Sequence, residues 1–253
     1  MKLYFRKTGE GFPLIILHGL FGSGDNWFSL SNLFGEDYTV YTPDARNHGR
    51  SAHTEITSYE LMADDLLELA DSEGLKKFHL LGHSMGGKTA MQFACLHNGL
   101  VDKLVISDIG PKHYPIHHQE ILSILNSPGN QKFESRKEAE SKLQNSLPEY
   151  IVKFLAKNLV RDEQGIYIWR FNLKGITSNI EKIGSSQLHL PAFQNPVLFL
   201  KGEHSEYIVD SDLNNIPLLF PNSEMQVVAN AGHWIHADNP EAFMNVVKGF
   251  LER

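Results

Sequence analysis

Short runs of apolar residues recur along the chain, and each is bounded by Gly, Pro or Asp. Runs that are apolar at successive positions are typical of parallel strands buried on both faces. A further strand is expected near the end of the chain. The expected strands are 14–17 (LIIL), 38–41 (YTVY), 78–81 (FHLL), 104–106 (LVI), 197–200 (VLFL) and 224–228 (EMQVV).

Stretches with helical spacing lie between these runs. Helices are expected over 59–69, 84–97 and 240–251, where apolar side chains recur every three to four residues. Strand and helix therefore alternate, which predicts an α/β fold with a mostly parallel, doubly wound sheet.

The alternation breaks between residues 112 and 191. Apolar residues there repeat every four positions, as in Ile151, Leu155 and Leu159, which predicts helices with no strands between them. The one exception is a short extended piece where residues alternate from Tyr167 to Leu173. We interpret 112–191 as a mostly helical cap inserted in a single core domain that comprises 1–111 and 192–253.

Composition narrows the class of protein. The 253 residues are 42% hydrophobic and 21% charged, as in ordinary globular chains. The formal charge of −7 and the lack of Lys/Arg runs argue against a nucleic-acid partner. Cys95 is the only cysteine, which excludes an intrachain disulfide. No apolar run is long enough for a membrane span. We expect a cytoplasmic protein, and nothing in the sequence indicates its oligomeric state.

The strongest chemical signal follows the strand 78–81. Gly82-His83-Ser84-Met85-Gly86 is a G-x-S-x-G sequence that leads directly into a helical pattern. This is the setting of a nucleophile elbow, in which a sharp strand-to-helix turn presents the serine hydroxyl. The sequence therefore predicts Ser84 as a nucleophile, and the alternative is a plain glycine turn.

A serine nucleophile needs a base, and thirteen histidines compete for that role. His233 is the best placed, because it follows the last strand and precedes the last helix, where a loop reaches the carboxyl edge of the sheet. Its alternative role is to cap the closing helix. The glycine-rich turn after the first strand, residues 18–23, predicts an oxyanion hole formed by the backbone N–H groups of Leu20 and Met85.

Five segments in order, HGLFGSGDNW, DARNHGRS, GHSMGGK, SDIGP and AGHWIHADNP, resemble the α/β-hydrolase superfamily along essentially the whole chain. Within it the sequence is most similar to the bacterial YbfF-type esterase branch, related to abhydrolase-domain-containing protein 11. The resemblance implies cleavage of short-chain esters or acyl-CoA thioesters, which are small-molecule substrates. A serine nucleophile with a histidine base requires no metal or organic cofactor.

The acid of the triad departs from the commonest superfamily pattern. The usual aspartate after the strand 197–200 is replaced by Ser205. Asp108 ends the strand beside the nucleophile strand and completes the order Ser84, Asp108, His233, which suits the fold. The YbfF-type branch implies the same acid position. Glu206 is the reserve acid, and Ser205 is a possible hydrogen-bond partner of the imidazole or the acid.

The remaining polar and aromatic candidates have weaker signals. The polar loop 44–51 is interpreted as structural, and His117 with His118 is not interpreted as a metal site because adjacent residues on a helix face apart. Aromatic residues are candidates for the substrate pocket, although aromatic stripes usually pack in cores. The candidates are Phe21, Trp169, Tyr207 and Trp234.

Two other functions fit the same motifs. One is a lyase of the menaquinone-pathway type, which shares the fold and the triad but performs no hydrolysis. The other is a ligand-binding protein on a hydrolase scaffold.

Overall fold

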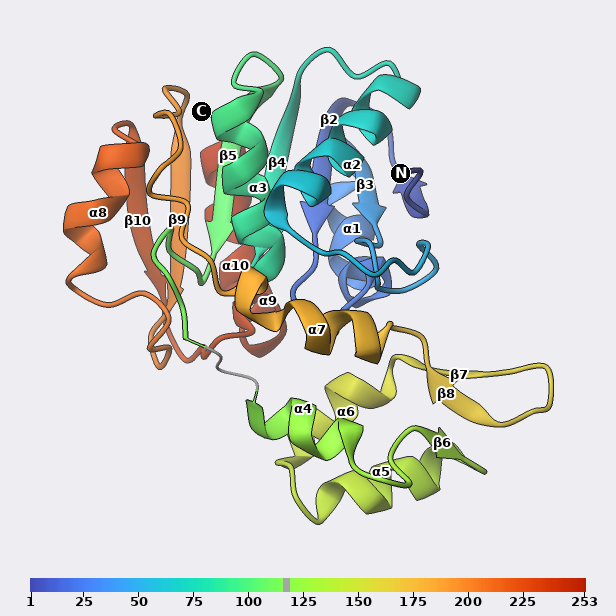
Figure 1. Cartoon of the computed structure of the whole chain (residues 1–253). Coiled ribbons are helices and arrows are strands. Elements are labelled where there is room, and N and C mark those ends of the chain that lie inside the picture. Colours follow the sequence, from blue (N-terminus) through green and yellow to red (C-terminus); the bar gives the residue numbers. More distant parts are fainter. Residues whose placement is uncertain (116–118) are drawn as a thin grey trace.

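The computed structural model describes residues 1–115 and 119–253, and its centre is a seven-stranded sheet (Figure 1). The strands are β1 (Phe5–Thr8), β2 (Phe12–Leu17), β3 (Tyr38–Pro43), β4 (Phe78–His83), β5 (Val101–Ser107), β9 (Val197–Gly202) and β10 (Ser223–Val228). Their order is β1-β3-β2-β4-β5-β9-β10. All neighbours are parallel except β1 and β3, which pair antiparallel at one edge.

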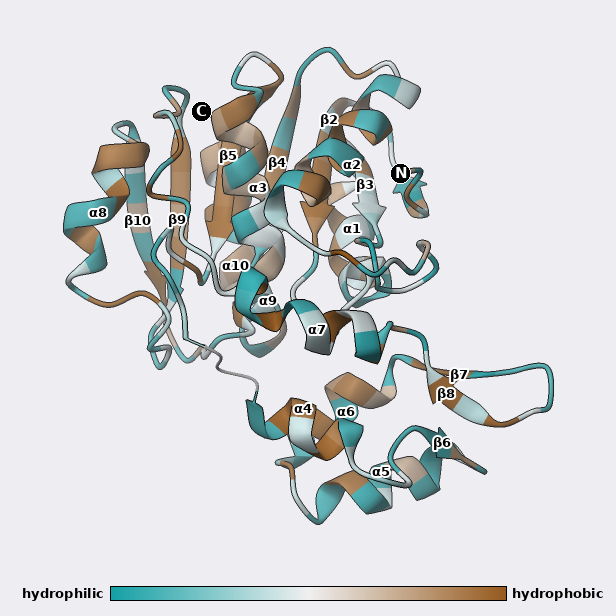
Figure 2. Cartoon of the chain, viewed as in Figure 1, coloured by the Kyte–Doolittle hydropathy of each residue, from teal (hydrophilic) through white to brown (hydrophobic). Residues whose placement is uncertain are grey.

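Helices cover both faces of this sheet. They are α1 (Phe28–Phe34), α2 (Tyr59–Ser72), α3 (Met85–Leu96), α8 (Asp212–Leu219), α9 (Ile235–Asp238) and α10 (Pro240–Leu251). Side chains alternate along a strand, so Ile15 and Leu17 of β2 pack with α2 and α3, while Leu14 and Ile16 pack with α1 and α10. The central strands are apolar at successive positions because both faces are buried (Figure 2). The predicted α/β fold is confirmed.

The segment between β5 and β9 lies beyond the carboxyl ends of the strands (Figure 1). Its elements are α4 (Gln119–Asn126), β6 (Lys132–Phe133), α5 (Arg136–Gln144), α6 (Glu149–Ala156), β7 (Leu159–Arg161), β8 (Tyr167–Trp169) and α7 (Leu173–Ile183). Apolar residues of these elements form one core cluster together with Leu20, Phe21 and Met85 of the sheet domain. The cap therefore packs directly on the loops that end β2 and β4.

The cap contains more strand than its sequence predicts. Leu159, expected to continue a helix, begins β7, and the small antiparallel sheet has the order β6-β8-β7. Leu159 pairs with Trp169, ten residues further along the chain. The extended piece predicted from the alternation over 167–173 is present as β8, but it ends at Trp169. The strands β6 and β7 have two and three residues, too few to show a period of two, so only their pairing reveals them. Within the described residues, no helix is long and apolar enough to span a membrane.

Candidate active site

Ser84 stands at the turn between β4 and α3, with φ 53° and ψ −119°. This conformation is sparsely populated for a residue with a side chain and is maintained by its surroundings. A Cβ atom on Gly82 would lie 2.2 Å from the carbonyl oxygen of Gly86, and one on Gly86 would lie 2.5 Å from that of Leu17. The two glycines therefore permit the tight turn that the G-x-S-x-G pattern predicts.

The structure brings the predicted acid and base together. Nδ1 of His233 lies 2.8 Å from Oδ2 of Asp108, although the two residues are far apart in the sequence. Asp108 directly follows β5, has a φ of 53° and is fully buried. The Gly202 backbone N–H donates to its Oδ1 at 3.1 Å, and the Ser205 hydroxyl donates to its Oδ2. These two groups supply the hydrogen bonds that a buried carboxylate cannot obtain from water.

Burial raises the pKa of Asp108 to about 6, while the hydrogen bonds from Ser205 and Gly202 oppose that rise because they stabilise the charged form. At pH 7 the carboxyl group is therefore mostly ionised and accepts hydrogen bonds. The reserve acid, Glu206, is exposed, and Ser205 contacts the acid rather than the imidazole. The geometry thus favours Asp108 over Glu206 as the partner of His233.

Two aromatic neighbours hold the His233 loop. The Tyr207 ring stacks on the His233 imidazole, with centroids 3.7 Å apart and planes 14° apart. Nε2 of His83 lies 2.8 Å from the His233 carbonyl oxygen and donates to it. Burial lowers the pKa of His83 well below its usual value, so this ring is neutral. No local pattern marks His83 for this contact, because its partner lies 150 residues further along the chain.

The turn after β2 is held by two further neutral histidines. Nε2 of His18 accepts the Ala45 N–H at 3.0 Å, and Nε2 of His48 accepts the Phe21 N–H at 3.2 Å. Burial lowers the pKa of His18 to about 4 and that of His48 to about 3. Leu20 lies in this turn and lines the same cavity as Ser84 and Met85. Met85 is the first residue of α3, where a backbone N–H has no acceptor within its own helix.

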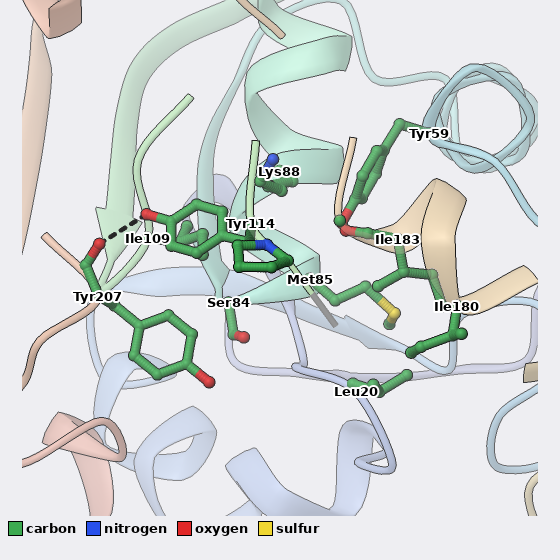
Figure 3. Close-up of a pocket in the computed structure, with 12 residues that line it drawn as sticks. Leu20, Tyr59, Ser84, Met85, Lys88, Ile109, Tyr114, Ile180, Ile183 and Tyr207 are labelled. Carbon is green, nitrogen blue, oxygen red and sulfur yellow. Dashed lines mark hydrogen bonds between the residues drawn. The ribbon is translucent and has the colours of Figure 1, made fainter. Parts of the chain in front are cut away.

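Ser84 lies between two cavities. The first has an empty volume of about 420 Å³, including the part open to solvent, and its wall includes Tyr207 (Figure 3). The second has an empty volume of about 380 Å³ and is lined by Trp234 and His233. Ser84 therefore lines both cavities.

The other two pocket candidates lie elsewhere. Trp169 packs inside the cap against Phe133 and Phe171, and its indole N–H donates to the Asn130 carbonyl at 2.8 Å. Phe21 is buried against Phe171, so its side chain joins the cap to the sheet domain. Neither lines the two cavities at Ser84. Phe21 and Trp169 therefore pack in a core, which was the alternative to the predicted role in the substrate pocket.

Three residues of the first cavity had no role in the sequence analysis. Lys88 lines it from α3, and the rings of Tyr59 and Tyr114 lie beside Lys88 (Figure 3). A signal for Lys88 was present, because it is the only charged residue of α3 and follows Ser84 by one helical turn. Tyr59 and Tyr114 reach the cavity only through the fold.

The polar loop after β3 makes structural contacts. Arg46 forms a buried ion pair with Asp65 at 2.7 Å, and Asp44 accepts the backbone N–H groups of Gly24 and Arg50, each at 2.7 Å. The histidines considered for a metal site, 117 and 118, lie outside the described residues. Among the residues that the structure does describe, no cluster of three His, Cys, Asp or Glu side chains is arranged to hold a metal.

The fold and this site define the class of protein. Residues 13–240 match the model of the alpha/beta hydrolase fold family, and the chain belongs to that family. It is 33% identical to Esterase YbfF of Escherichia coli (94% of this chain, 92% of the relative). It is also 38% identical to the mouse sn-1-specific diacylglycerol lipase ABHD11 (94% and 80%). A solved marine microorganism esterase superposes with a TM-score of 0.95 at 42% identity, covering 98% of this chain and 99% of its own. The similar proteins are thus esterases and lipases of this fold.

Proposed function

We propose that the protein is a serine hydrolase that cleaves carboxylic esters or acyl thioesters through an acyl-serine intermediate. The observation that carries the proposal is the hydrogen bond of 2.8 Å between His233 and a buried Asp108, in a site where His233 and Ser84 line one cavity. The similarity to named esterases supports the same reaction class.

In the proposed mechanism, His233 Nε2 takes the proton of the Ser84 hydroxyl as the oxygen attacks the acyl carbonyl. Asp108 keeps the proton of His233 on Nδ1 and stabilises the imidazolium that forms. The backbone N–H groups of Leu20 and Met85 bind the oxyanion. His233 then protonates the departing alcohol or thiol, and afterwards activates the water that releases the acid.

The chain-length preference follows from the cavity that Ser84 shares with Tyr207. Its lining includes the cap residues Ile180, Ile183 and Gly184, so we propose that the segment 112–191 sets the size of the acyl group and restricts it to short chains.

The test is hydrolysis of p-nitrophenyl esters from acetate to palmitate, with Ser84→Ala measured in parallel. We expect turnover that peaks at short chains and falls by roughly 10⁶-fold in the variant, because removing the nucleophile leaves only binding and oxyanion stabilisation. Acyl-CoA thioesters of the same chain lengths then separate ester from thioester preference.

Retention of wild-type turnover by Ser84→Ala would contradict the assignment of the nucleophile. Folded wild-type protein that hydrolyses no ester or thioester would contradict the proposed reaction and favour the lyase or the binding scaffold.

A further inference from the structure

Tyr114 lies where the chain leaves β5 for the cap, and its side chain is buried beside the triad. It is 6% exposed and belongs to the cavity wall shown in Figure 3. Burial raises the pKa of Tyr114 above its usual value, so the hydroxyl keeps its proton and can both donate and accept a hydrogen bond. It does both, once toward the segment of the acid and once toward that of the base.

The hydrogen bond that the hydroxyl accepts holds the loop of the acid. The Gly110 backbone N–H donates to the Tyr114 hydroxyl oxygen at 2.8 Å, two residues after Asp108. Asp108 has a φ of 53°, a conformation that persists only where surrounding contacts maintain it. The Asp108 N–H donates to the Leu200 carbonyl at 2.8 Å and fixes one end of this short segment. Tyr114 fixes the other end.

The hydrogen bond that the hydroxyl donates holds the aromatic neighbour of the base. It goes to the Tyr207 backbone carbonyl at 2.7 Å and is the dashed line in Figure 3. The rings of Tyr114 and Tyr207 also stack, with centroids 5.7 Å apart and planes 28° apart. The Tyr207 ring in turn stacks on the His233 imidazole. A shift of the Tyr207 backbone therefore moves the surface against which the imidazole rests.

The backbone of Tyr114 contacts the segment that returns from the cap. Its N–H donates to the Gly184 carbonyl at 2.8 Å. A Cβ atom on Gly184 would lie 2.2 Å from the Tyr114 carbonyl oxygen, so the two backbones are in direct contact. The cap therefore fixes the tyrosine, and the hydroxyl of the tyrosine reaches the segments of Asp108 and His233.

We propose that Tyr114 is a positioning residue, whose hydroxyl sets the geometry of the Asp108–His233 pair. This inference rests on the proposed hydrolase function and adds a residue to its machinery. Proton transfer depends on the placement of the base, and a misplacement of about 1 Å can cost on the order of a hundredfold in rate. Loss of the hydroxyl should therefore lower kcat through the pair.

Tyr59 provides a matched control. It is also buried, lines the same cavity and lies with its ring beside Lys88, as Tyr114 does. Its hydroxyl also donates to a backbone carbonyl, that of Ile183. That bond joins α2 to the end of α7, and not to the segments of the acid or the base. Replacement by Phe removes one buried hydroxyl at either position, but only the hydroxyl of Tyr114 binds those two segments.

The experiment is a double-mutant cycle with Asp108→Asn on one short-chain p-nitrophenyl ester. Tyr114→Phe should lower kcat by roughly tenfold and change KM by less than about twofold, because the hydroxyl orders catalytic groups and not the substrate. In the Asp108→Asn background the same change should cost less than about twofold, since His233 then holds the wrong tautomer and its exact position no longer limits kcat. The effect of Tyr59→Phe on kcat, whatever its size, should be equal in the two backgrounds.

Equal effects of Tyr114→Phe in the two backgrounds overturn the proposal, because a purely structural hydroxyl acts independently of the Asp108–His233 pair. Wild-type kcat in folded Tyr114→Phe also overturns it. Both results leave the hydrolase function standing, because the wild type still cleaves the ester. A folded wild type that cleaves no ester or thioester contradicts the hydrolase function itself, and this inference with it.

If Tyr114→Phe does not fold, Gly110→Ala takes its place in the cycle. A Cβ atom on Gly110 would lie 3.2 Å from the Tyr114 hydroxyl oxygen, so the alanine displaces the hydroxyl by a few tenths of an ångström and leaves the tyrosine in place. The kcat should fall by about two- to fivefold, and only while Asp108 is present. An unchanged kcat, or an equal loss in both backgrounds, overturns the proposal.

Discussion

Asp108 and Glu206 are two carboxyl groups that differ in burial, and burial determines which of them can orient His233. Asp108 is buried at the end of β5 and bound by Ser205, Gly202 and His233, whereas Glu206 is exposed. A buried carboxylate that is hydrogen-bonded to an imidazole can hold one tautomer of that ring, and an exposed carboxylate with no such bond cannot. The environment of each side chain, and not its residue type, therefore distinguishes their roles.

Asp108→Asn should lower kcat by roughly 10⁴-fold, because an amide that donates to Nδ1 holds the wrong tautomer of His233. Glu206→Gln is the matched control and should leave kcat within a factor of two. Steady-state kinetics on one short-chain ester measures both. A large loss in Glu206→Gln with none in Asp108→Asn would exchange the two acids.

At the scale of elements, the cap and the turn after β2 are joined by a buried side chain. Asn158 precedes β7, and its Nδ2 donates to the Phe21 carbonyl at 2.7 Å. Phe21 has a φ of 60°, a conformation uncommon for a residue with a side chain. It directly follows Leu20, so the cap helps to hold the predicted oxyanion donor in place.

Asn158→Leu should lower kcat by up to about tenfold with little change in KM, which is less than the loss of an entire oxyanion donor. Asn179→Leu is the control, because Asn179 makes a similar bond from α7 to the Glu55 carbonyl at 2.8 Å, away from Ser84. The two variants are compared on one short-chain ester. Equal effects on kcat would mean that the Asn158 bond contributes only to cap stability.

At the scale of the whole molecule, both crossings between sheet domain and cap meet at one side chain. Lys112 lies where the chain leaves the sheet domain, Ser185 lies where it returns, and Lys88 binds the carbonyl of each. The same side chain therefore lines the cavity that includes Ser84 and joins the two crossings. Its charge therefore influences the stability of the fold.

The pKa of Lys88 is lowered to about 7 in the folded protein, below its usual 10.5, so the unfolded chain binds more protons between these two values. The unfolding free energy of the wild type should therefore rise with pH over this range relative to Lys88→Met. Urea unfolding at pH 7 and pH 10 measures the difference. Lys103→Met is the control, because Lys103 also donates to two backbone carbonyls. If the difference in unfolding free energy between wild type and Lys88→Met does not grow with pH, Lys88 is not a buried amine with a lowered pKa.

The local pattern determined six of the seven strands of the sheet, the helix α10 and the turn at Ser84, but it did not predict the edge strand β1. Each depends on neighbouring residues: a run of apolar positions marks a buried strand, and Gly82 and Gly86 permit the elbow. The positions of His233 and Asp108 also followed from the sequence, because carboxyl ends of parallel strands meet at one edge of the sheet.

Only the tertiary structure decided the rest. The strands β6 and β7 have two and three residues and carry no periodic signal, so they form only through their pairing with β8. The burial of Asp108 and the exposure of Glu206, which support the assignment made from the sequence, and the packing of Trp169 within the cap are visible only in the fold. The surroundings of Lys88 depend on segments about a hundred residues apart in the chain, which no local pattern of the sequence brings together. Contacts at long range set burial and charge compensation, and these determine what a side chain can do.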